Sequence, residues 1–357
     1  MLWLLIFMPV ALVLDALPGA PAPLVFFSAA LAIVPIASLI VAGTEHLATY
    51  TGPTLGGLLN ATFGNLPELI ISIAALRAGL TAMVRASIVG ALLANLLLGL
   101  GLTFLLGGLR RHSQEFNPVG ARAYGSMMFL AAISMAVPSA FHRFFSAGAG
   151  IAHGSGLDTS VAIVLLITYG LYLLYQLRTH KESFAAAEGS EEASEEGPAW
   201  GLPRAVGTLV LASGAAAWMS EVLVGSAEKT GEALGMSPTF IGLVILAGVG
   251  GAAEIGSAVA MGRRNKMDLA IGIVLGSCIQ ISLFVAPVLV LLGGLISPQP
   301  FTLSFGQSEI GFLFLTVILG TMVVGEGRSN WFKGVQLLAA YAILAAVCYL
   351  VPAVAAP

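Results

Sequence analysis

The chain has 357 residues, of which 58% are hydrophobic and only 9% are charged, and its mean hydropathy is +0.96. Soluble domains carry about 25% charged residues, so this composition excludes an ordinary soluble protein and indicates that lipid surrounds most of the chain. The net charge of −3 is too small to indicate nucleic acid as a partner. Cys278 and Cys348 both lie in apolar stretches and predict neither a disulfide framework nor a thiolate metal site.

Eleven apolar runs are long enough to form helices that cross about 30 Å of hydrocarbon. They lie at 2–17, 23–50, 54–79, 82–109, 119–140, 157–180, 203–231, 237–263, 267–295, 304–325 and 329–353. The first run has no basic residues at its start, so we interpret it as a retained short helix and not as a signal peptide. Several runs end at stop signals such as Gly52-Pro53 and Ser297-Pro298. The sequence therefore predicts an all-α, polytopic membrane protein with 11 transmembrane helices.

The basic residues divide unequally between the two sides that eleven helices define. Four lie on the side opposite the N-terminus, namely Arg77, Arg85, Arg143 and Lys229. Eleven lie on the side of the N-terminus: Arg110, Arg111, Arg122, Arg178, Lys181, Arg204, Arg263, Arg264, Lys266, Arg328 and Lys333. Because basic loops stay in the cytoplasm, we expect a multi-pass protein of the cell membrane with a cytoplasmic N-terminus and its C-terminus on the opposite side.

Two stretches around Glu68 and Glu254 resemble each other at a constant offset of 186 residues (254 − 68). The same offset relates Gly64 to Gly250, Gly90 to Gly276, and Gly107-Gly108 to Gly293-Gly294. Each repeat then holds five helices, and an odd number of helices inverts the second repeat relative to the first. The predicted organisation is an N-terminal transmembrane helix (1–22), a first five-helix repeat (23–181), an acidic cytoplasmic linker (182–202) and a second, inverted five-helix repeat (203–357).

The acidic linker contains Glu182, Glu188, Glu191, Glu192, Glu195 and Glu196 among Ala, Ser and Gly. Two interpretations stay open for it. It is either a solvated connection with a run of like charges or a cytoplasmic segment that senses or concentrates divalent cations.

Glu68 and Glu254 are the main candidate site residues because a carboxylate at membrane depth costs about 2.5–3.5 kcal/mol on insertion scales. Pro67 and Gly64 weaken the helix at Glu68, and glycines do the same before Glu254. Irregular backbone at that depth is tolerated where it lines a cavity, so carbonyl oxygens are expected to face inward. Carboxylate, carbonyl and amide oxygens together are the ligands of a hard cation such as Ca²⁺.

Further candidate metal ligands are Asn65, Asn95, Ser277 and Gln280, which lie on the predicted third, fourth and ninth helices. The alternative for each is a hydrogen bond between helices. Glu45, Glu228 and Glu221 are candidates for gating or for attracting cations at the two mouths. Solvated helix ends are the alternative for the first two.

Two neighbouring carboxylates can be neutralised by one divalent ion or by two protons. Glu68 and Glu254 can therefore hold metal or protons in competition, which is sufficient for an antiporter that carries the metal one way and protons the other. Crossing with two bare charges is costly, and this suppresses an unloaded leak.

At these residues the chain resembles the Ca²⁺/H⁺ antiporters (CAX) of the cation/Ca²⁺ exchanger superfamily. The first matching motif is Thr51-Gly52-Pro53-Thr54-Leu55-Gly56-Gly57-Leu58-Leu59-Asn60-Ala61-Thr62-Phe63-Gly64-Asn65 with Glu68-Leu69-Ile70. The second is Asn265-Lys266-Met267-Asp268-Leu269-Ala270-Ile271-Gly272 with Gly276-Ser277 and Gln280-Ile281. The resemblance implies that Glu68 and Glu254 are shared Ca²⁺ and H⁺ ligands and that helices two and seven are long, tilted gating helices.

The chain departs from this family beside the second glutamate. The family usually reads Gly-Asn-Ala-Ala-Glu-His, whereas Gly251 and Ile255 stand here in place of the Asn and the His. One amide ligand and one titratable group are therefore missing next to Glu254.

The leading hypothesis is a secondary antiporter that exports Ca²⁺ from the cytoplasm in exchange for H⁺, with the lipid bilayer as its environment and no cofactor besides the transported ions. The same fold with other ions (Na⁺/Ca²⁺ or Mn²⁺/H⁺ exchange), a passive cation channel and assembly into a homo-oligomer stay open. An enzyme is disfavoured, because the sequence has no His-Glu-x-x-His pair and no Gly-x-Ser-x-Gly at a strand-to-helix turn.

Overall fold

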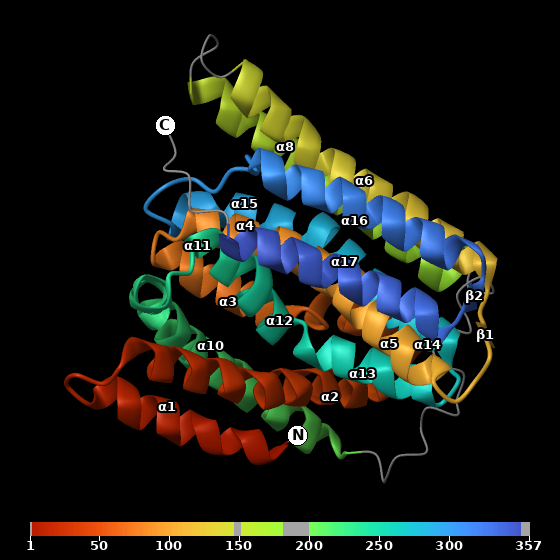
Figure 1. The fold of residues 1–357 in the computed structure, drawn as a ribbon, viewed down its shortest axis with the longest axis horizontal. Helices are drawn as coiled ribbons and strands as arrows, with labels where there is room; N and C mark the ends of the chain where they lie inside the picture. Colours follow the sequence, from red (N-terminus) through yellow and green to blue (C-terminus); the bar gives the residue numbers. More distant parts are fainter. Residues whose placement is uncertain (1, 146–150, 181–199, 351–357) are drawn as a thin grey trace.

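The protein is a bundle of long apolar helices, as the sequence predicts (Figure 1). The computed structural model describes residues 2–145, 151–180 and 200–350. Within these residues the only β structure is a pair of two-residue strands.

The first half of the chain contains a short N-terminal helix and the first set of longer helices. Its elements are η1 (Leu2–Ile6), α1 (Phe7–Ala16), α2 (Ala22–Phe63), α3 (Leu66–Arg77), α4 (Thr81–Leu93), η2 (Ala94–Gly99), α5 (Leu100–Gly108), β1 (Gln114–Glu115), α6 (Pro118–Phe144), α8 (Ile151–Leu174) and η3 (Tyr175–Thr179).

The second half repeats this series. Its elements are α10 (Leu202–Leu234), α11 (Pro238–Phe240), η5 (Ile241–Leu246), α12 (Ala247–Gly250), α13 (Ala252–Arg263), α14 (Met267–Gln280), η6 (Ile281–Val285), α15 (Ala286–Ile296), α16 (Gln307–Gly325), β2 (Arg328–Ser329) and α17 (Trp331–Leu350). The segments η2, η3, η5 and η6 are π-helical turns, whereas η1 is a 3₁₀ helix.

Eight helices in the described residues are long and apolar enough to cross a membrane, or nine when the bent pair Pro238–Gly250 and Ala252–Arg263 counts as one span. The shorter apolar helix Leu2–Ala16 and the broken segment that ends with α3 account for the other two predicted spans. The protein is thus a multi-pass membrane protein. Its helices are consistent with the eleven predicted spans. The repeat boundaries and the linker stay predictions, and residues 181–199 lie outside the described residues.

The predicted stop at Gly52-Pro53 coincides with a sharp change of direction inside α2. The membrane-length part of α2 ends at Thr51. A Cβ built at Gly56 would stand 2.8 Å from the carbonyl oxygen of Ala48, eight residues earlier. In a straight helix those residues would be about 12 Å apart along the axis. The chain therefore turns back on itself here and enters the segment that leads to Glu68.

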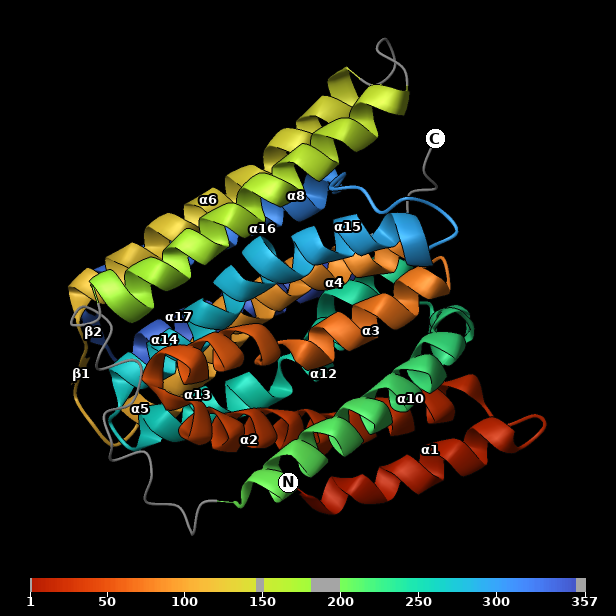
Figure 2. The same ribbon diagram turned by 180° about the vertical axis from the view of Figure 1, so that it is seen from behind.

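Three layers of helices are visible in Figures 1 and 2. Helices α1, α2 and α10 pack together on one side, and α6, α8 and α16 pack on the other. Between them lie α3, α4, α5 and their counterparts α12 to α15, together with α17. The middle layer contains both glutamate-bearing segments, so neighbouring helices cover it on both faces.

Equivalent π-helical turns interrupt the two long central helices at the same place in each repeat. η2 begins at Ala94 and ends at Gly99, and η6 ends at Val285, which is 186 residues after Gly99 (285 − 99). A π-helical turn inserts an extra residue into a helix and often marks a functional site. Asn95 lies inside η2, and Gln280 directly precedes η6.

The helix predicted at 304–325 begins later than expected, at Gln307. The residues before it form a strap without regular structure in which Phe301, Leu303 and Phe305 are buried. These alternating apolar side chains favour an extended segment pressed onto the bundle. Because the strap buries every second side chain, a count of apolar residues alone cannot distinguish it from a helix end.

Close packing between the repeats depends on glycine at the crossing of α4 and η5. A Cβ at Gly90 would collide with the backbone of Leu243, and a Cβ at Gly242 would collide with the backbone at Met83. Small residues allow helix backbones to approach closely inside a membrane. The crossing brings the first repeat's central helix against the second repeat's broken helix.

We expect Gly90→Ala to destabilise the protein by about 1–3 kcal/mol, the usual cost of overpacking a well-packed core. Gly276→Ala is the matched control, because Gly276 occupies the equivalent position in the second repeat and a Cβ there meets nothing within 4 Å. Thermal unfolding in detergent should show a lower midpoint for Gly90→Ala and an unchanged or higher one for Gly276→Ala. Equal midpoints would contradict the proposed packing constraint.

Candidate ion-binding site

Glu68 lies directly after a break in its helix. α2 ends at Phe63, Gly64 and Asn65 form the break, and α3 begins at Leu66 with Glu68 in its first turn. Pro67 stands in that first turn, where its missing N–H leaves no further donor unpaired. The positive end of a helix dipole thus faces the carboxyl group. Glu68 is buried and only 8% exposed.

Glu254 occupies the same position relative to a second break. α12 ends at Gly250, Gly251 forms the break, and α13 begins at Ala252 with Glu254 in its first turn, after a bend of 55°. Glu254 is 7% exposed. Glu68 precedes the end of α3 at Arg77 by nine residues (77 − 68), and Glu254 precedes the end of α13 at Arg263 by nine as well (263 − 254). Both glutamates therefore occupy matching positions within their helices.

Each break is faced by an amide side chain from the other repeat. A Cβ at Gly64 would stand 3.4 Å from Gln280 Oε1, and a Cβ at Gly251 would stand 3.6 Å from Asn95 Oδ1. The two amides come from the π-helical regions of the central helices. The pseudo-symmetric repeats thus place one amide against each break.

A hydrogen-bond chain joins the two repeats at this level. Asn95 Nδ2 donates to Ser277 Oγ at 3.0 Å, and Ser277 Oγ donates to Asn65 Oδ1 at 2.8 Å. All three side chains are buried. The chain fixes the amide of Asn95 so that its nitrogen is used and its oxygen Oδ1 is left without a hydrogen bond.

Glu68 reaches the break that precedes Glu254. A Cβ at Gly250 would stand 3.0 Å from Glu68 Cγ and 3.3 Å from Glu68 Oε1, so Glu68 lies against the second repeat's break. The carboxyl groups of Glu68 and Glu254 also interact electrostatically. All four of their oxygens are buried without a hydrogen-bond partner among the described residues. Buried polar atoms are normally hydrogen-bonded, so these oxygens are available to a ligand.

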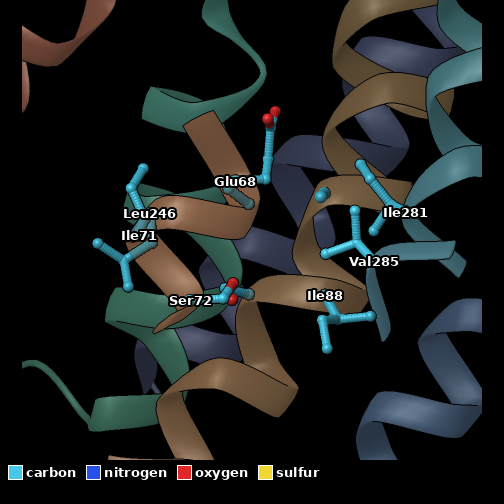
Figure 3. Close-up of a pocket in the computed structure, with 10 residues that line it drawn as sticks. Glu68, Ile71, Ser72, Ile88, Leu246, Ile281 and Val285 are labelled. Atoms are coloured by element: carbon cyan, nitrogen blue, oxygen red, sulfur yellow. The ribbon is translucent and has the colours of Figure 1, made fainter. Parts of the chain in front are cut away.

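A pocket begins at Glu68 (Figure 3). Its further lining residues on α3 and α4 lie toward the end of the bundle that carries the 77–81 and 296–307 connections. Its empty volume, counted together with the open space at its mouth, is about 320 Å³. Glu68 and Ser72 enter it from α3, and Ile281 and Val285 form the facing wall. Its remaining lining residues are Ile71, Ser87, Ile88, Ala91, Leu246 and Ala247. Ser72 is a polar lining residue that sequence reasoning missed, because a single serine in an apolar run carries no distinguishing signal.

The three candidate mouth residues lie away from this centre. All three are exposed on the surface of the bundle, namely Glu45, Glu221 and Glu228. Glu221 approaches Arg77 at 3.7 Å in an exposed ion pair. Their proposed roles in attracting cations or in gating stay predictions, and the structure does not bring them together with Glu68 and Glu254.

The donor set at the centre suits a hard cation that binds reversibly. Among the described residues no three His, Cys, Asp or Glu side chains come together to hold a metal. The centre instead offers two carboxyl groups with amide and hydroxyl oxygens. Oxygen donors of mixed charge suit Ca²⁺, which tolerates flexible geometry, and the same carboxyl oxygens can accept protons.

Comparison with known proteins identifies the relatives of this chain. The family model described as "Sodium/calcium exchanger protein" matches residues 21–178 and 204–350. The chain is 39% identical to a Ca(2+)/H(+) antiporter of Aphanothece halophytica over 92% of this chain and 91% of that protein. It is 40% identical to the Ca(2+)/H(+) antiporter ChaA of Bacillus subtilis over 93% of this chain and 94% of that protein.

Solved structures share the fold. The structure of native YfkE superposes with a TM-score of 0.82 at 35% identity and covers 98% of this chain and 100% of that one. The crystal structure of the H+/Ca2+ exchanger CAX has a TM-score of 0.71 and covers 98% of this chain and 91% of that one, but at 14% identity it supports the fold alone. The expected resemblance is thus confirmed: the chain belongs to the sodium/calcium exchanger protein family, among relatives named as Ca²⁺/H⁺ antiporters.

Proposed function

We propose that this protein is a secondary active antiporter that exports Ca²⁺ from the cytoplasm in exchange for H⁺ by alternating access. The observation that carries the proposal is the pair of buried carboxyl groups, Glu68 and Glu254, whose four oxygens have no hydrogen-bond partner among the described residues. Relatives that are 39% and 40% identical over more than 90% of the chain carry the name Ca²⁺/H⁺ antiporter, which supports these ions.

The proposed Ca²⁺ ligands are drawn from both repeats. Four carboxylate oxygens of Glu68 and Glu254, Oδ1 of Asn95 and Oε1 of Gln280 make six oxygens, the lower limit of the six to eight that Ca²⁺ takes. Asn65 and Ser277 complete the predicted set. In this structure the oxygen of Asn65 accepts the hydrogen bond from Ser277, so both act first by holding Asn95 in place.

Protons compete with Ca²⁺ for the same carboxylates. When Ca²⁺ leaves, two adjacent buried carboxylates would be left with their charges uncompensated, which strongly favours proton uptake. The site therefore switches its access from one side of the membrane to the other when it holds either Ca²⁺ or protons. It switches poorly when both carboxylates are charged and empty. This exclusion of the empty, charged state couples the two fluxes, and it also argues against a passive cation channel.

The choice of ion depends on an asymmetry between the two breaks. Asn65 supplies a side chain at the first break, whereas Gly251 supplies none at the equivalent position of the second. Ile255, which follows Glu254, packs against Gly99 and adds no polar group. Exchange of Na⁺ for Ca²⁺, or of Mn²⁺ for H⁺, is the alternative that this reduced donor set leaves open.

The proposed placement is the cell membrane, with the N-terminus in the cytoplasm and the C-terminus on the opposite side, in keeping with the excess of basic residues on the N-terminal side. Two inverted five-helix repeats (23–181 and 203–357) joined by the acidic linker (182–202) complete the proposed organisation. The proposal includes no resident cofactor and no enzymatic activity, and it leaves assembly into a homo-oligomer open.

Glu68→Gln and Glu254→Gln should each lower proton-driven Ca²⁺ uptake into inside-out vesicles by more than about 100-fold. Removing a partner of a metal ligand typically lowers metal affinity or activity by 10–100-fold. Removing a charged ligand itself is expected to lower transport by more than that. Glu232→Gln is the matched control, because this carboxyl group is exposed near the end of α10 and belongs to neither break. The assay compares Ca²⁺, Mn²⁺ and Na⁺ under an imposed pH gradient.

Two outcomes of this vesicle assay would contradict the proposal. Ca²⁺ uptake that ignores the pH gradient would remove proton coupling and favour a channel. Full proton-coupled transport by Glu68→Gln would remove the shared carboxylate site, even if the ions were assigned correctly.

Ser277→Ala should raise the Ca²⁺ concentration for half-maximal uptake by about 10-fold, since outer-shell partners of metal ligands typically contribute 10–100-fold in affinity. The change breaks the chain that holds Asn95 and Asn65. Ser282→Ala is the control, because Ser282 donates only to the carbonyl oxygens of Cys278 and Ile279 in its own helix. Equal half-maximal Ca²⁺ concentrations in the two variants would show that the hydrogen bonds of Ser277 do not position the site.

A further inference from the structure

A second group of charged side chains is buried away from Glu68 and Glu254. It consists of Arg85 on α4, His142 on α6, Asp158 on α8 and Glu309 on α16, and we call it the peripheral cluster. Arg85 lies near the start of α4, His142 near the end of α6, and Glu309 near the start of α16. All four therefore lie at the end of the bundle that carries the 77–81 and 296–307 connections.

Hydrogen bonds tie this cluster to the strap that precedes α16. His142 Nε2 lies 2.9 Å from Asp158 Oδ2, and Asp158 Oδ1 accepts from the backbone N–H of Leu303 at 3.4 Å. Glu309 Oε2 accepts from the N–H of Gly306 at 2.8 Å and caps its own helix. Asp158 and Glu309 are 1% and 7% exposed, so neither charge is screened by direct contact with solvent.

Arg85 is half-buried and interacts electrostatically with both carboxyl groups. Within residues 2–145, 156–180 and 200–350, the charges of the cluster do not balance on their own. The guanidinium contributes one positive charge and the two carboxylates contribute two negative charges, so the sum is −1 while His142 is neutral. Cys348 on α17 also interacts with Glu309, and Arg143 beside His142 is exposed. A buried uncompensated charge is strongly unfavourable.

We infer that Arg85, His142, Asp158 and Glu309 form a second proton-binding site, separate from Glu68 and Glu254, which holds one exchangeable proton. The proton brings the net charge of the cluster to zero. Either His142 or a carboxyl group carries it, and because these groups interact it belongs to the cluster as a whole. As the pH falls, the site changes from a net charge of −1 to neutrality by taking up that proton.

The position of the cluster relates it to the pocket. α4 bears Arg85 and, two residues further along, Ser87, which lines the pocket that begins at Glu68. The same helix thus links the peripheral cluster with the wall of that pocket. A group that gains and loses a proton at this end changes the local charge next to the route that the pocket follows toward the central carboxyl groups.

Proton uptake by the purified protein tests this inference directly. The Glu68→Gln/Glu254→Gln double variant removes the central carboxyl groups, so the result does not depend on the proposed exchange function. Acidifying this variant from roughly pH 8 to pH 5, the range in which histidine-containing sites titrate, should add about one more proton per molecule than the triple variant with Glu309→Gln takes up. Glutamine can keep the helix cap that Glu309 makes, so the substitution removes the charge and preserves the contact.

Two further variants distinguish proton binding from a structural role. Asp158→Asn in the double-variant background should lose the same single proton, because either substitution brings the cluster to zero charge with His142 neutral. Glu309→Asp, which keeps a carboxyl group, should retain it. Size-exclusion elution identifies any variant that does not fold, and Asp158→Asn then replaces Glu309→Gln. Equal proton uptake with and without the Glu309 or Asp158 carboxyl group in folded protein would overturn the inference.

Discussion

Glu68 and Glu254 are carboxyl groups that the fold buries without giving their oxygens a hydrogen bond within the described residues. Each ionised carboxylate at membrane depth costs about 2.5–3.5 kcal/mol on insertion scales. Because the two groups also interact electrostatically, an empty site with both of them charged is unfavourable. A divalent cation or two protons would remove this penalty, and we propose that the competition between those two loads is the physical basis of exchange.

The fold around Glu68 and Glu254 places polar groups and helix starts near the two buried carboxyl groups. Helix breaks at Gly64-Asn65 and at Gly251 direct the start of a helix toward each carboxyl group. Gly250 lets Glu68 approach the opposite break, and the glycine crossing of α4 and η5 brings the two repeats close enough for their residues to share one site. The chain from Asn95 through Ser277 to Asn65 then fixes one amide oxygen toward the centre.

The repeat was the most informative feature of the sequence. A constant offset of 186 residues predicted that Glu68 and Glu254 would occupy equivalent places, and the structure gives both the same position after a helix break. Apolar runs also predicted most helix bounds within a few residues. The predicted stop at Gly52-Pro53 matches the turn inside α2. The π-helical turns at Asn95 and directly after Gln280, and the strap before α16, were not predicted, because they arise from packing between segments far apart in the sequence. The peripheral cluster was not predicted either, because Arg85, Asp158 and Glu309 lie far apart in the sequence and share no local motif.

In the proposed mechanism, protons and Ca²⁺ compete for one pair of carboxyl groups, Glu68 and Glu254. Calorimetric titration of the purified protein with Ca²⁺ in buffers of different ionisation enthalpy, repeated at several pH values, measures both the affinity and the number of protons released. If the two ions compete, the apparent Ca²⁺ affinity falls as the pH falls, and Ca²⁺ binding releases protons whenever the site is protonated beforehand. An affinity that does not change with pH, with no protons released, would contradict it.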